Sequence, residues 1–437
     1  MSFLFSGNRV ESEPNLLFDK ADSSAVHKQV YWGLRRFGPY EKNIRKVRVV
    51  ELATRETIGK LDGIVDGLNK GVDIMPGGMS SFFRCEIESV EKFLSPSIRT
   101  VDYVSTANQI STSYEPREVD VVLSFIPFTS RYFKNTPYYR LKASLTTHGF
   151  VSQMVTEHTI ANLRWSYVNL ASAVFAKAGG VPWVLESEMK NTDIIIGVAV
   201  SQHVSQRTRA GSLARYVGFV NVFDRFGRWL FFEGTARPYV KGKNFEQLRE
   251  LLTKAFERYK AESPEKPPPR NVVIHYYKRY SEEEKEDVLK ILSEVLGNFK
   301  VAFVSIDDSH PYRLYDFDRA DAAFPMGGYV YLNDDEILLS TTGASEQAAR
   351  RMGTPRILHI RVNQHPERFL SLDDVASQVL SLTKLDWATA TPMVREPVTM
   401  QFSQEIAYLT GAISEGEWVG LTEPRVNEIL SKRTWFI

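Results

Sequence analysis

Apolar and polar positions in the first half of the chain follow two alternating periods. Short apolar runs predict strands at residues 47–53, 80–88, 119–127 and 181–187. Helical spacing is found in residues 57–71, from Pro137 to Gly149, and from about Asn162 to Lys177. Because strands that alternate with helices build βαβ units, we expect a parallel, doubly wound α/β sheet.

The pattern changes after about Ser187. Hairpins are predicted around a turn at 224–227 and within 328–342. Further strands are predicted at 193–202, 271–277, 300–307 and 356–362, and helices at 244–260, 282–297, 372–387 and 403–413. This order is typical of an RNase H-like fold. Since 437 residues suit two domains, we expect a lead-in segment at 1–45, a first domain at 46–186 and a second at 187–437.

The two helices between residues 137 and 177 carry the candidate binding chemistry. Tyr138 and Lys142 are four residues apart and share one face of the first helix. Asn169 and Lys177 share a face of the second helix, and Gln153 lies in the extended piece between the helices. A ring, two ammonium groups and an amide can thus converge on one pocket, which suits a terminal phosphate beside a stackable base.

Tyr138, Lys142, Gln153 and Lys177 match, in order and approximate spacing, a residue set of the MID domain of Argonaute proteins, which the chain resembles. The resemblance implies that Tyr138 stacks on the first guide base and that the other three grip the guide 5′ phosphate. Asn169 is a further candidate contact. The hydrophobic ending at Ile437 is similar to that of Argonautes, which implies that its carboxylate, with Gln153 nearby, helps to hold Mg²⁺ against the phosphate.

The resemblance covers nearly the whole chain and is closest to short prokaryotic, archaeal-type Argonautes. It implies a Rossmann-like MID domain followed by an RNase H-like PIWI domain, with no room for the N and PAZ domains of long members. Residues 33–40 resemble the segment that enters the MID domain, and residues 309–316 resemble a PIWI loop. The resemblance to short Argonautes also implies a separate APAZ-type partner subunit. This subunit would be linked to an effector, and the effector can be membrane-linked.

Slicing Argonautes need several carboxylates around two divalent cations. The resemblance places Ala199 and Tyr277 at the first two aspartate positions and Glu405 at or beside the closing one. Alanine cannot ligate a metal, and tyrosine is a poor Mg²⁺ ligand. Acidic residues remain nearby, namely Asp193, Glu233, Asp307 and Asp308. We therefore expect a protein that does not cleave its target.

Composition narrows the class of protein only slightly. The net charge of +1 does not by itself indicate a polyanion partner, although basic residues cluster locally. The single cysteine, Cys85, excludes an internal disulfide, predicts a packed thiol and fits a cytoplasmic protein. No apolar run is long enough to insert into a membrane. The glycine pair at 77–78 does not form a dinucleotide fingerprint.

We therefore expect a guide-dependent nucleic-acid-binding protein of a prokaryotic defence system. By resemblance, the guide would be a small RNA and the recognised target DNA, with a partner subunit passing on the signal. Two alternatives remain open. One is an active guide-directed endonuclease that uses non-standard carboxylates, and the other is a two-domain α/β protein that binds a small phosphorylated ligand.

Overall fold

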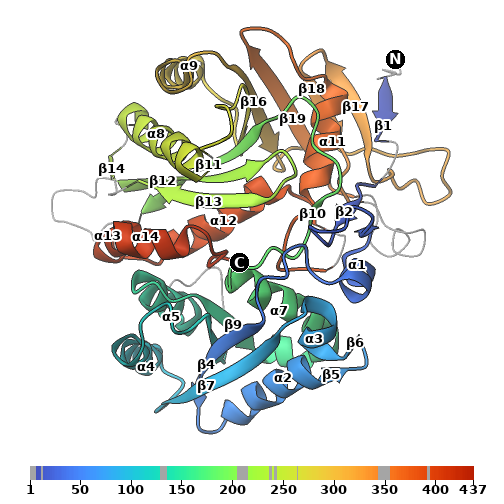
Figure 1. Cartoon of the computed structure of the whole chain (residues 1–437). Helices are drawn as coiled ribbons and strands as arrows, with labels where there is room; N and C mark the ends of the chain where they lie inside the picture. Colours follow the sequence, from blue (N-terminus) through green and yellow to red (C-terminus); the bar gives the residue numbers. More distant parts are fainter. Residues whose placement is uncertain are drawn as a thin grey trace.

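The computed structural model describes residues 6–10, 13–127, 135–203, 215–235, 239–240, 244–262, 264–342, 355–390 and 394–437. These residues form two bodies, each built around its own sheet, and the C-terminus lies between them (Figure 1). Within the described part of the chain, none of the helices combines the length and apolar character needed to cross a membrane.

Four parallel strands form the sheet of the first body, in the order β7–β4–β8–β9. Successive residues of β4 serve opposite faces: Val49 packs on the side of α2, α3 and α7, and Val50 on the side of α4 and α5. This confirms the predicted parallel, doubly wound sheet. The strands are β4 (Lys46–Thr54), β7 (Glu86–Ser95), β8 (Val121–Ile126) and β9 (Ser152–Thr156), and the helices are α2 (Ile58–Lys70), α3 (Gly78–Phe83), α4 (Thr100–Ser113), α5 (Pro137–Thr147), α6 (Glu157–Ala161) and α7 (Leu163–Lys177). A small hairpin, β5 (Gly71–Val72) with β6 (Met75–Pro76), follows α2.

The strand predicted at 80–88 is wrong in its first half, because α3 covers this stretch and β7 begins only at Glu86. Gly77 and Arg84 adopt left-handed backbone conformations at the two ends of α3. Phe82 and Phe83 are both buried by this short helix. Cys85, which follows α3 in the chain, is also buried, and burial raises the pKa of its thiol to about 12. This confirms the packed thiol.

The second body contains a ten-stranded mixed sheet in the order β1–β17–β18–β19–β16–β15–β11–β12–β13, with β14 paired to β12. Its centre, β11, β15 and β16, is parallel. Helices α8 and α9 cover one face, and α11 and α12 cover the other. The strands are β11 (Ile194–His203), β12 (Arg215–Asp224), β13 (Trp229–Gly234), β14 (Tyr239–Val240), β15 (Asn271–Tyr276), β16 (Lys300–Asp307), β17 (Gly328–Asn333), β18 (Glu336–Leu339) and β19 (Leu358–His365). The helices are α8 (Asn244–Glu262), α9 (Glu282–Val295), α11 (Leu372–Leu382) and α12 (Val398–Thr410). The predicted RNase H-like order is confirmed.

Two helices after α12 were not predicted. They are α13 (Glu415–Thr422) and α14 (Pro424–Leu430). Their signals are present in the sequence, because Ser414 and Glu417 form a capping box and Pro424 occupies the first turn of α14. Helix α13 reaches the first body, where Arg140 of α5 pairs with Glu417 at 2.7 Å.

The lead-in segment is shared between the two bodies. Strand β1 (Gly7–Arg9) extends the large sheet by pairing with β17. Strand β2 (Leu16–Leu17) pairs with β3 (Val26–His27) and with β10 (Val184–Leu185). The strand predicted at 181–187 is thus reduced to β10 and does not join the first parallel sheet. Helix α1 (Val30–Phe37) follows β3.

The end of the chain is buried between the bodies. Trp435 and Phe436 are at most 1% exposed. The ring of Phe436 packs against Trp229 of β13 and Phe402 of α12, with centroids 5.8 and 4.9 Å apart. This packing explains how a short tail is held in one place, next to helix α5 of the first body.

Candidate functional site

Lys142 and Lys177 are the most unusual side chains at the junction of the two bodies. They are 2% and 1% exposed, although ammonium groups are rarely buried. Lys142 lies on α5, with its Nζ 5.6 Å from the centre of the Tyr138 ring. The predicted approach of Tyr138 and Lys142 is present in the structure. Tyr138 itself is half-buried.

The buried chain end supplies hydrogen-bond acceptors to Lys142. Its Nζ donates to the carbonyl oxygen of Phe436 at 2.9 Å and to an oxygen of Ile437 at 3.4 Å. The resemblance placed Ile437 near the pocket, and the structure does so by inserting Phe436 into the second body. No sequence pattern indicated the role of the Phe436 carbonyl, because any residue type supplies the same backbone oxygen.

Lys177, at the C-terminus of α7, meets Gln153 on β9. The lysine Nζ donates to Gln153 Oε1 at 2.6 Å, and Gln153 Nε2 donates to the Met154 carbonyl at 3.0 Å. Gln153 therefore lies in a strand of the sheet and not only in an extended linker. Its geometry joins α7 to β9, as the predicted pocket requires.

Asn169 faces a different neighbour. Its Oδ1 accepts a hydrogen bond from the Ala390 backbone N–H at 2.8 Å. The side chain is partly exposed and connects α7 to the segment after α11. The structure thus gives Asn169 a role in holding the two bodies together, and its contact with a phosphate stays a prediction.

Burial dominates the electrostatics of the two lysines. It lowers the pKa of Lys142 to about 8, against the opposing effect of the Glu405 carboxylate. It also lowers the pKa of Lys177 well below the usual value, and the neighbouring charge of Lys142 lowers it further. Two ammonium groups that repel each other in a buried site favour an anion as ligand.

Oxygen donors for a divalent cation are present at this junction. Gln153 Oε1 and the Ile437 oxygen are hard ligands of the type that Mg²⁺ prefers, and here each accepts a hydrogen bond from a lysine. Within the described part of the chain, no three His, Cys, Asp or Glu side chains form a metal-binding group. The donor set therefore fits Mg²⁺ only if an anionic ligand supplies further oxygens and draws the lysines toward itself.

Ala199 and Tyr277 line a separate cavity of about 600 Å³ in the second body. Helix α12 contributes Met400, Ser403 and Gln404 to its wall. Gln404, the residue beside Glu405, thus lines the cavity at the position predicted for the closing residue, while the Glu405 charge acts on Lys142 and Lys177. The two neighbours differ because one residue along α12 rotates the side chain by about 100° to another face.

The acidic residues of this cavity form ion pairs or hydrogen bonds with residues that lie next to them. Asp308 pairs with Arg395, and Gln404 donates to Glu396. Burial and the nearby Asp308 charge raise the pKa of Glu396. Asp307 accepts the Ser309 backbone N–H at 2.8 Å. Glu396 was not among the predicted residues. The sequence offered one local indication of its place, since Glu396 directly precedes Pro397, the N-cap residue of α12.

The two remaining predicted carboxylates are structural. Asp193 accepts from Arg225 at 2.8 Å and from the backbone N–H groups of Arg270 and Asn271 at 2.9 Å. Glu233 pairs with Arg258 and accepts from Asn427. Both carboxylates therefore fix neighbouring elements of the second body.

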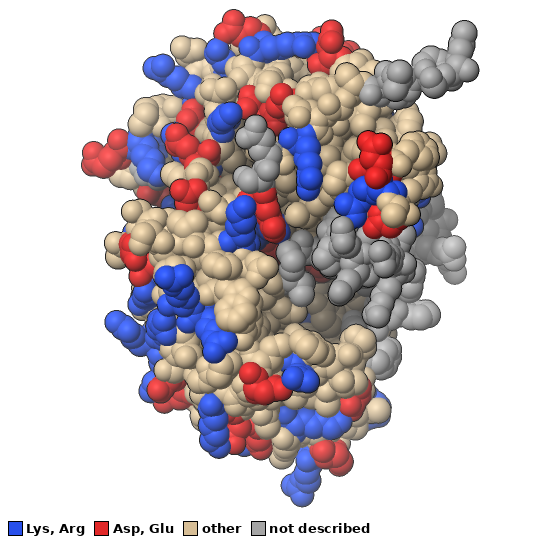
Figure 2. All heavy atoms as spheres, turned by 90° about the vertical axis from the view of Figure 1, so that its right-hand side faces the viewer, with Lys and Arg blue, Asp and Glu red and all other residues tan. Residues whose placement is uncertain are grey.

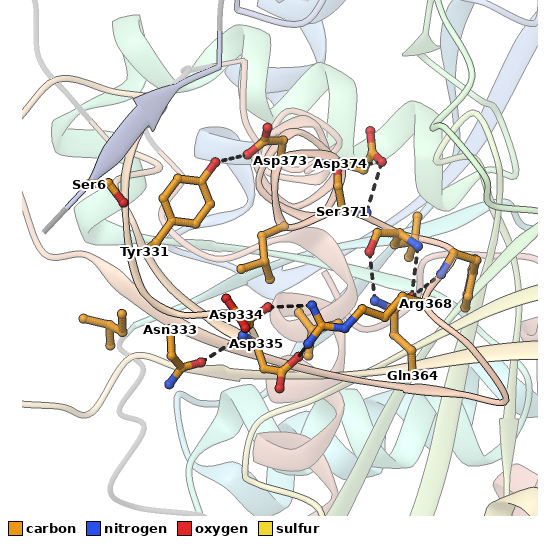
Figure 3. A pocket seen from close by; sticks show the side chains of 15 residues that line it. Ser6, Tyr331, Asn333, Asp334, Asp335, Gln364, Arg368, Ser371, Asp373 and Asp374 are labelled. Carbon is orange, nitrogen blue, oxygen red and sulfur yellow. Dashed lines mark hydrogen bonds and ion pairs between the residues drawn. The ribbon is translucent and has the colours of Figure 1, made fainter.

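Another hollow, of about 890 Å³, lies at the β1 edge of the large sheet (Figure 3). Its polar groups bind one another: Arg368 donates to Asp335 at 2.7 Å, and the Tyr331 hydroxyl donates to Asp373. Ser371 and Asp374 form the capping box of α11. These groups stabilise the edge of the sheet, in contrast to the buried lysines.

Comparison with known proteins agrees with this arrangement. Residues 127–414, more than half of the chain, match the Piwi domain family. The chain is 23% identical to the Argonaute of Cereibacter sphaeroides over 466 residues, which cover 98% of this chain and 59% of the relative. It is 22% identical to the Argonaute of Aquifex aeolicus, covering 92% and 54%. The chain thus spans a little over half the length of these relatives.

Solved structures show the same fold. Clostridium butyricum Argonaute bound to a guide DNA and a 19-mer target DNA has a TM-score of 0.71 at 18% identity, covering 94% of this chain and 54% of that one. Drosophila Piwi has a TM-score of 0.71 at 17% identity, covering 99% and 56%. The resemblance to Argonautes is therefore confirmed. The chain belongs to the Piwi domain family, and its two bodies correspond to the MID and PIWI parts of the Argonaute fold.

Proposed function

We propose that this protein binds the 5′ phosphate of a small guide nucleic acid at the junction of its two bodies and uses the guide to recognise a complementary strand. One observation carries the proposal: Lys142 and Lys177 are buried together, and their charges repel each other. A phosphate between them would relieve this repulsion and keep both lysines protonated.

The first guide nucleotide would occupy the pocket in two parts. Its phosphate would draw the Nζ atoms of Lys142 and Lys177 away from the Phe436 carbonyl and Gln153. Each hydrogen bond to a charged group contributes about 1.5–3 kcal/mol, so the pair can discriminate a phosphate from a hydroxyl end by a factor of a hundred or more. The base would stack on the Tyr138 ring for roughly 1–3 kcal/mol.

The Ile437 carboxylate and Gln153 would hold Mg²⁺, which would supply positive charge to the bound phosphate. When bound, it would neutralise charge that the two lysines leave uncompensated. In our proposal the lysines position the phosphate and the cation adds affinity, so a guide can bind weakly without Mg²⁺.

We further propose that the protein does not cleave its target. The support is that Ala199 and Tyr277 line the cavity where the resemblance places the catalytic aspartates. The rival is a nuclease that uses Asp307, Asp308 and Glu396, which lie in the same cavity. A cleavage assay with Mg²⁺ and with Mn²⁺ separates the two proposals.

The biological role that we propose is prokaryotic defence. The guide would be RNA and the target DNA, and a separate APAZ-type subunit would pass the signal to an effector. The similar Clostridium butyricum Argonaute was solved with a guide DNA and a target DNA, so guides of both chemistries belong in the test.

The deciding experiment compares one short oligonucleotide carrying either a 5′ phosphate or a 5′ hydroxyl, at fixed salt, with Mg²⁺ and with EDTA. We expect a strong preference for the phosphate that weakens in EDTA and in Lys142→Ala. Equal binding of both ends by the wild-type protein would contradict the proposal.

A further inference from the structure

Helix α1 presents an outer face that the pocket does not use. Gly33 and Leu34 form its buried side, and a Cβ at Gly33 would come within 2.1 Å of the Phe18 ring. This close packing fixes the rotation of the helix. Trp32, Arg35 and Arg36 consequently lie on the exposed side, at helical spacings of three and four residues.

Trp32 is 48% exposed, which is unusual for so large an apolar ring. The Arg35 guanidinium lies over it at 5.5 Å, and Arg36 lies over Phe37 at 5.1 Å. Neither arginine forms an ion pair with any carboxylate in the described part of the chain. The face therefore combines an accessible ring with two positive charges that no carboxylate of the described residues pairs with.

The chain contains a matched counterexample on α7. Trp165 is 66% exposed and has Arg164 over its ring at 5.1 Å. However, Arg164 pairs with Asp73 at 2.8 Å. The charge of Arg164 is thus balanced by a carboxylate, and α1 differs because no carboxylate in the described part of the chain pairs with its two arginines.

Helix α1 is connected to α7 through the segment after α11. Its start, from Lys28 to Tyr31, shares a cavity of about 270 Å³ with Ala390. The backbone N–H of Ala390 is held by Asn169 of α7. Figure 2 views the molecule from the side on which α1 lies in Figure 1, and Lys and Arg side chains gather there at the left margin, just below mid-height.

We propose that the outer face of α1 is a second nucleic-acid contact, which stacks one unpaired base on Trp32 and binds the flanking phosphates with Arg35 and Arg36. A single strand suits this face because an aromatic ring accepts any base, and guanidinium groups bind phosphates in the extended backbone. An acidic peptide would use the arginines but would gain little from the Trp32 ring. The proposal rests on the proposed function only in assuming a nucleic-acid ligand, and it uses a different surface.

The test measures the affinity of the full chain for a short single-stranded RNA with a 5′ hydroxyl, and for the same RNA with a 5′ phosphate. We expect Trp32→Ala to weaken binding of both RNAs by about tenfold, and Trp32→Phe to retain most of the affinity. Arg35→Ala with Arg36→Ala should make the slope of log affinity against log salt shallower by about 1.4. Trp165→Ala, the matched control, should leave both affinities unchanged.

The outcomes separate this proposal from the pocket. Lys142→Ala should weaken binding only of the RNA with the 5′ phosphate. If this variant binds that RNA as tightly as the wild type, the result would count against the pocket and not against α1. Unchanged binding in Trp32→Ala would overturn the α1 proposal, as would an equal loss in Trp165→Ala. A loss in the arginine variant without one in Trp32→Ala would also overturn it, in favour of an acidic protein partner.

Discussion

The lysine pocket and the Ala199 cavity contrast within one molecule. In the pocket, Lys142 and Lys177 are buried, and they donate hydrogen bonds to the Phe436 carbonyl, an oxygen of Ile437 and the side-chain oxygen of Gln153. In the cavity, Asp308 and Glu396 already have Arg395 and Gln404 as partners. The pocket holds two buried ammonium groups that repel each other, with the Glu405 carboxylate nearby, whereas the cavity holds carboxylates, and the Asp308 charge raises the pKa of Glu396. The cationic pocket therefore suits an anionic ligand, and our proposal that the second cavity does not cut a strand rests on Ala199 and Tyr277.

The largest expected effect is on the pocket. Lys142→Ala combined with Lys177→Met should abolish the preference for a 5′ phosphate, a loss of about a hundredfold or more, because two charge-assisted contacts disappear. Lys177→Met alone should leave the midpoint of thermal unfolding unchanged or raise it, since a buried ammonium is replaced by an apolar chain of similar size. Competition binding and calorimetry measure the two effects. A phosphate preference that survives the double substitution would break the comparison.

Acid should lower the stability of the folded protein through a buried histidine of β15. His275 of β15 is fully buried beside Thr399, at 2.8 Å, and burial lowers its pKa to about 4. Because the folded state keeps this histidine neutral, stability should be unaffected above pH 6.5 and should fall as the pH drops from 6.5 toward 4, by about 3 kcal/mol at most. Urea unfolding of wild type and His275→Gln across this range tests the prediction. An identical pH dependence in the variant would show that other groups are responsible.

Removal of divalent cations should have a smaller effect. EDTA should weaken binding of the 5′-phosphorylated guide by about tenfold, because the charge on the phosphate and the Ile437 carboxylate is then less well compensated. Binding of the 5′-hydroxyl guide is the control and should not change. Titration of Mg²⁺ back into the sample measures the recovery, and an equal loss for both guides would indicate a general effect of ions on the nucleic acid.

The smallest expected effect sharpens the other side of the comparison. Asp308→Asn and Glu396→Gln should change guide affinity by less than about twofold, because their partners are within the cavity. Neither substitution should alter the amount of intact target after incubation with Mn²⁺. Target cleavage by the wild-type protein that disappears in these variants would instead identify a working nuclease.

Much of the fold follows from local patterns. The apolar runs predicted β4, β8, β11, β15 and β16, because a strand buried on both faces needs nearly every residue to be apolar. The errors fall on short apolar runs. Residues 80–83 belong to α3, and only two residues of the predicted strand at 181–187 pair as β10. Short apolar runs fit either period, so packing chose between them.

The candidate pocket shows the same division. The sequence by itself determined that Tyr138 and Lys142 share a helix face and that Lys177 ends the next helix, because these relations depend on the helical repeat alone. Only the tertiary structure decided that the Phe436 carbonyl meets Lys142, that Asn169 holds Ala390, and that Glu405 faces the lysines and not the cavity. These contacts join residues more than two hundred positions apart, and their geometry depends on how the two bodies pack.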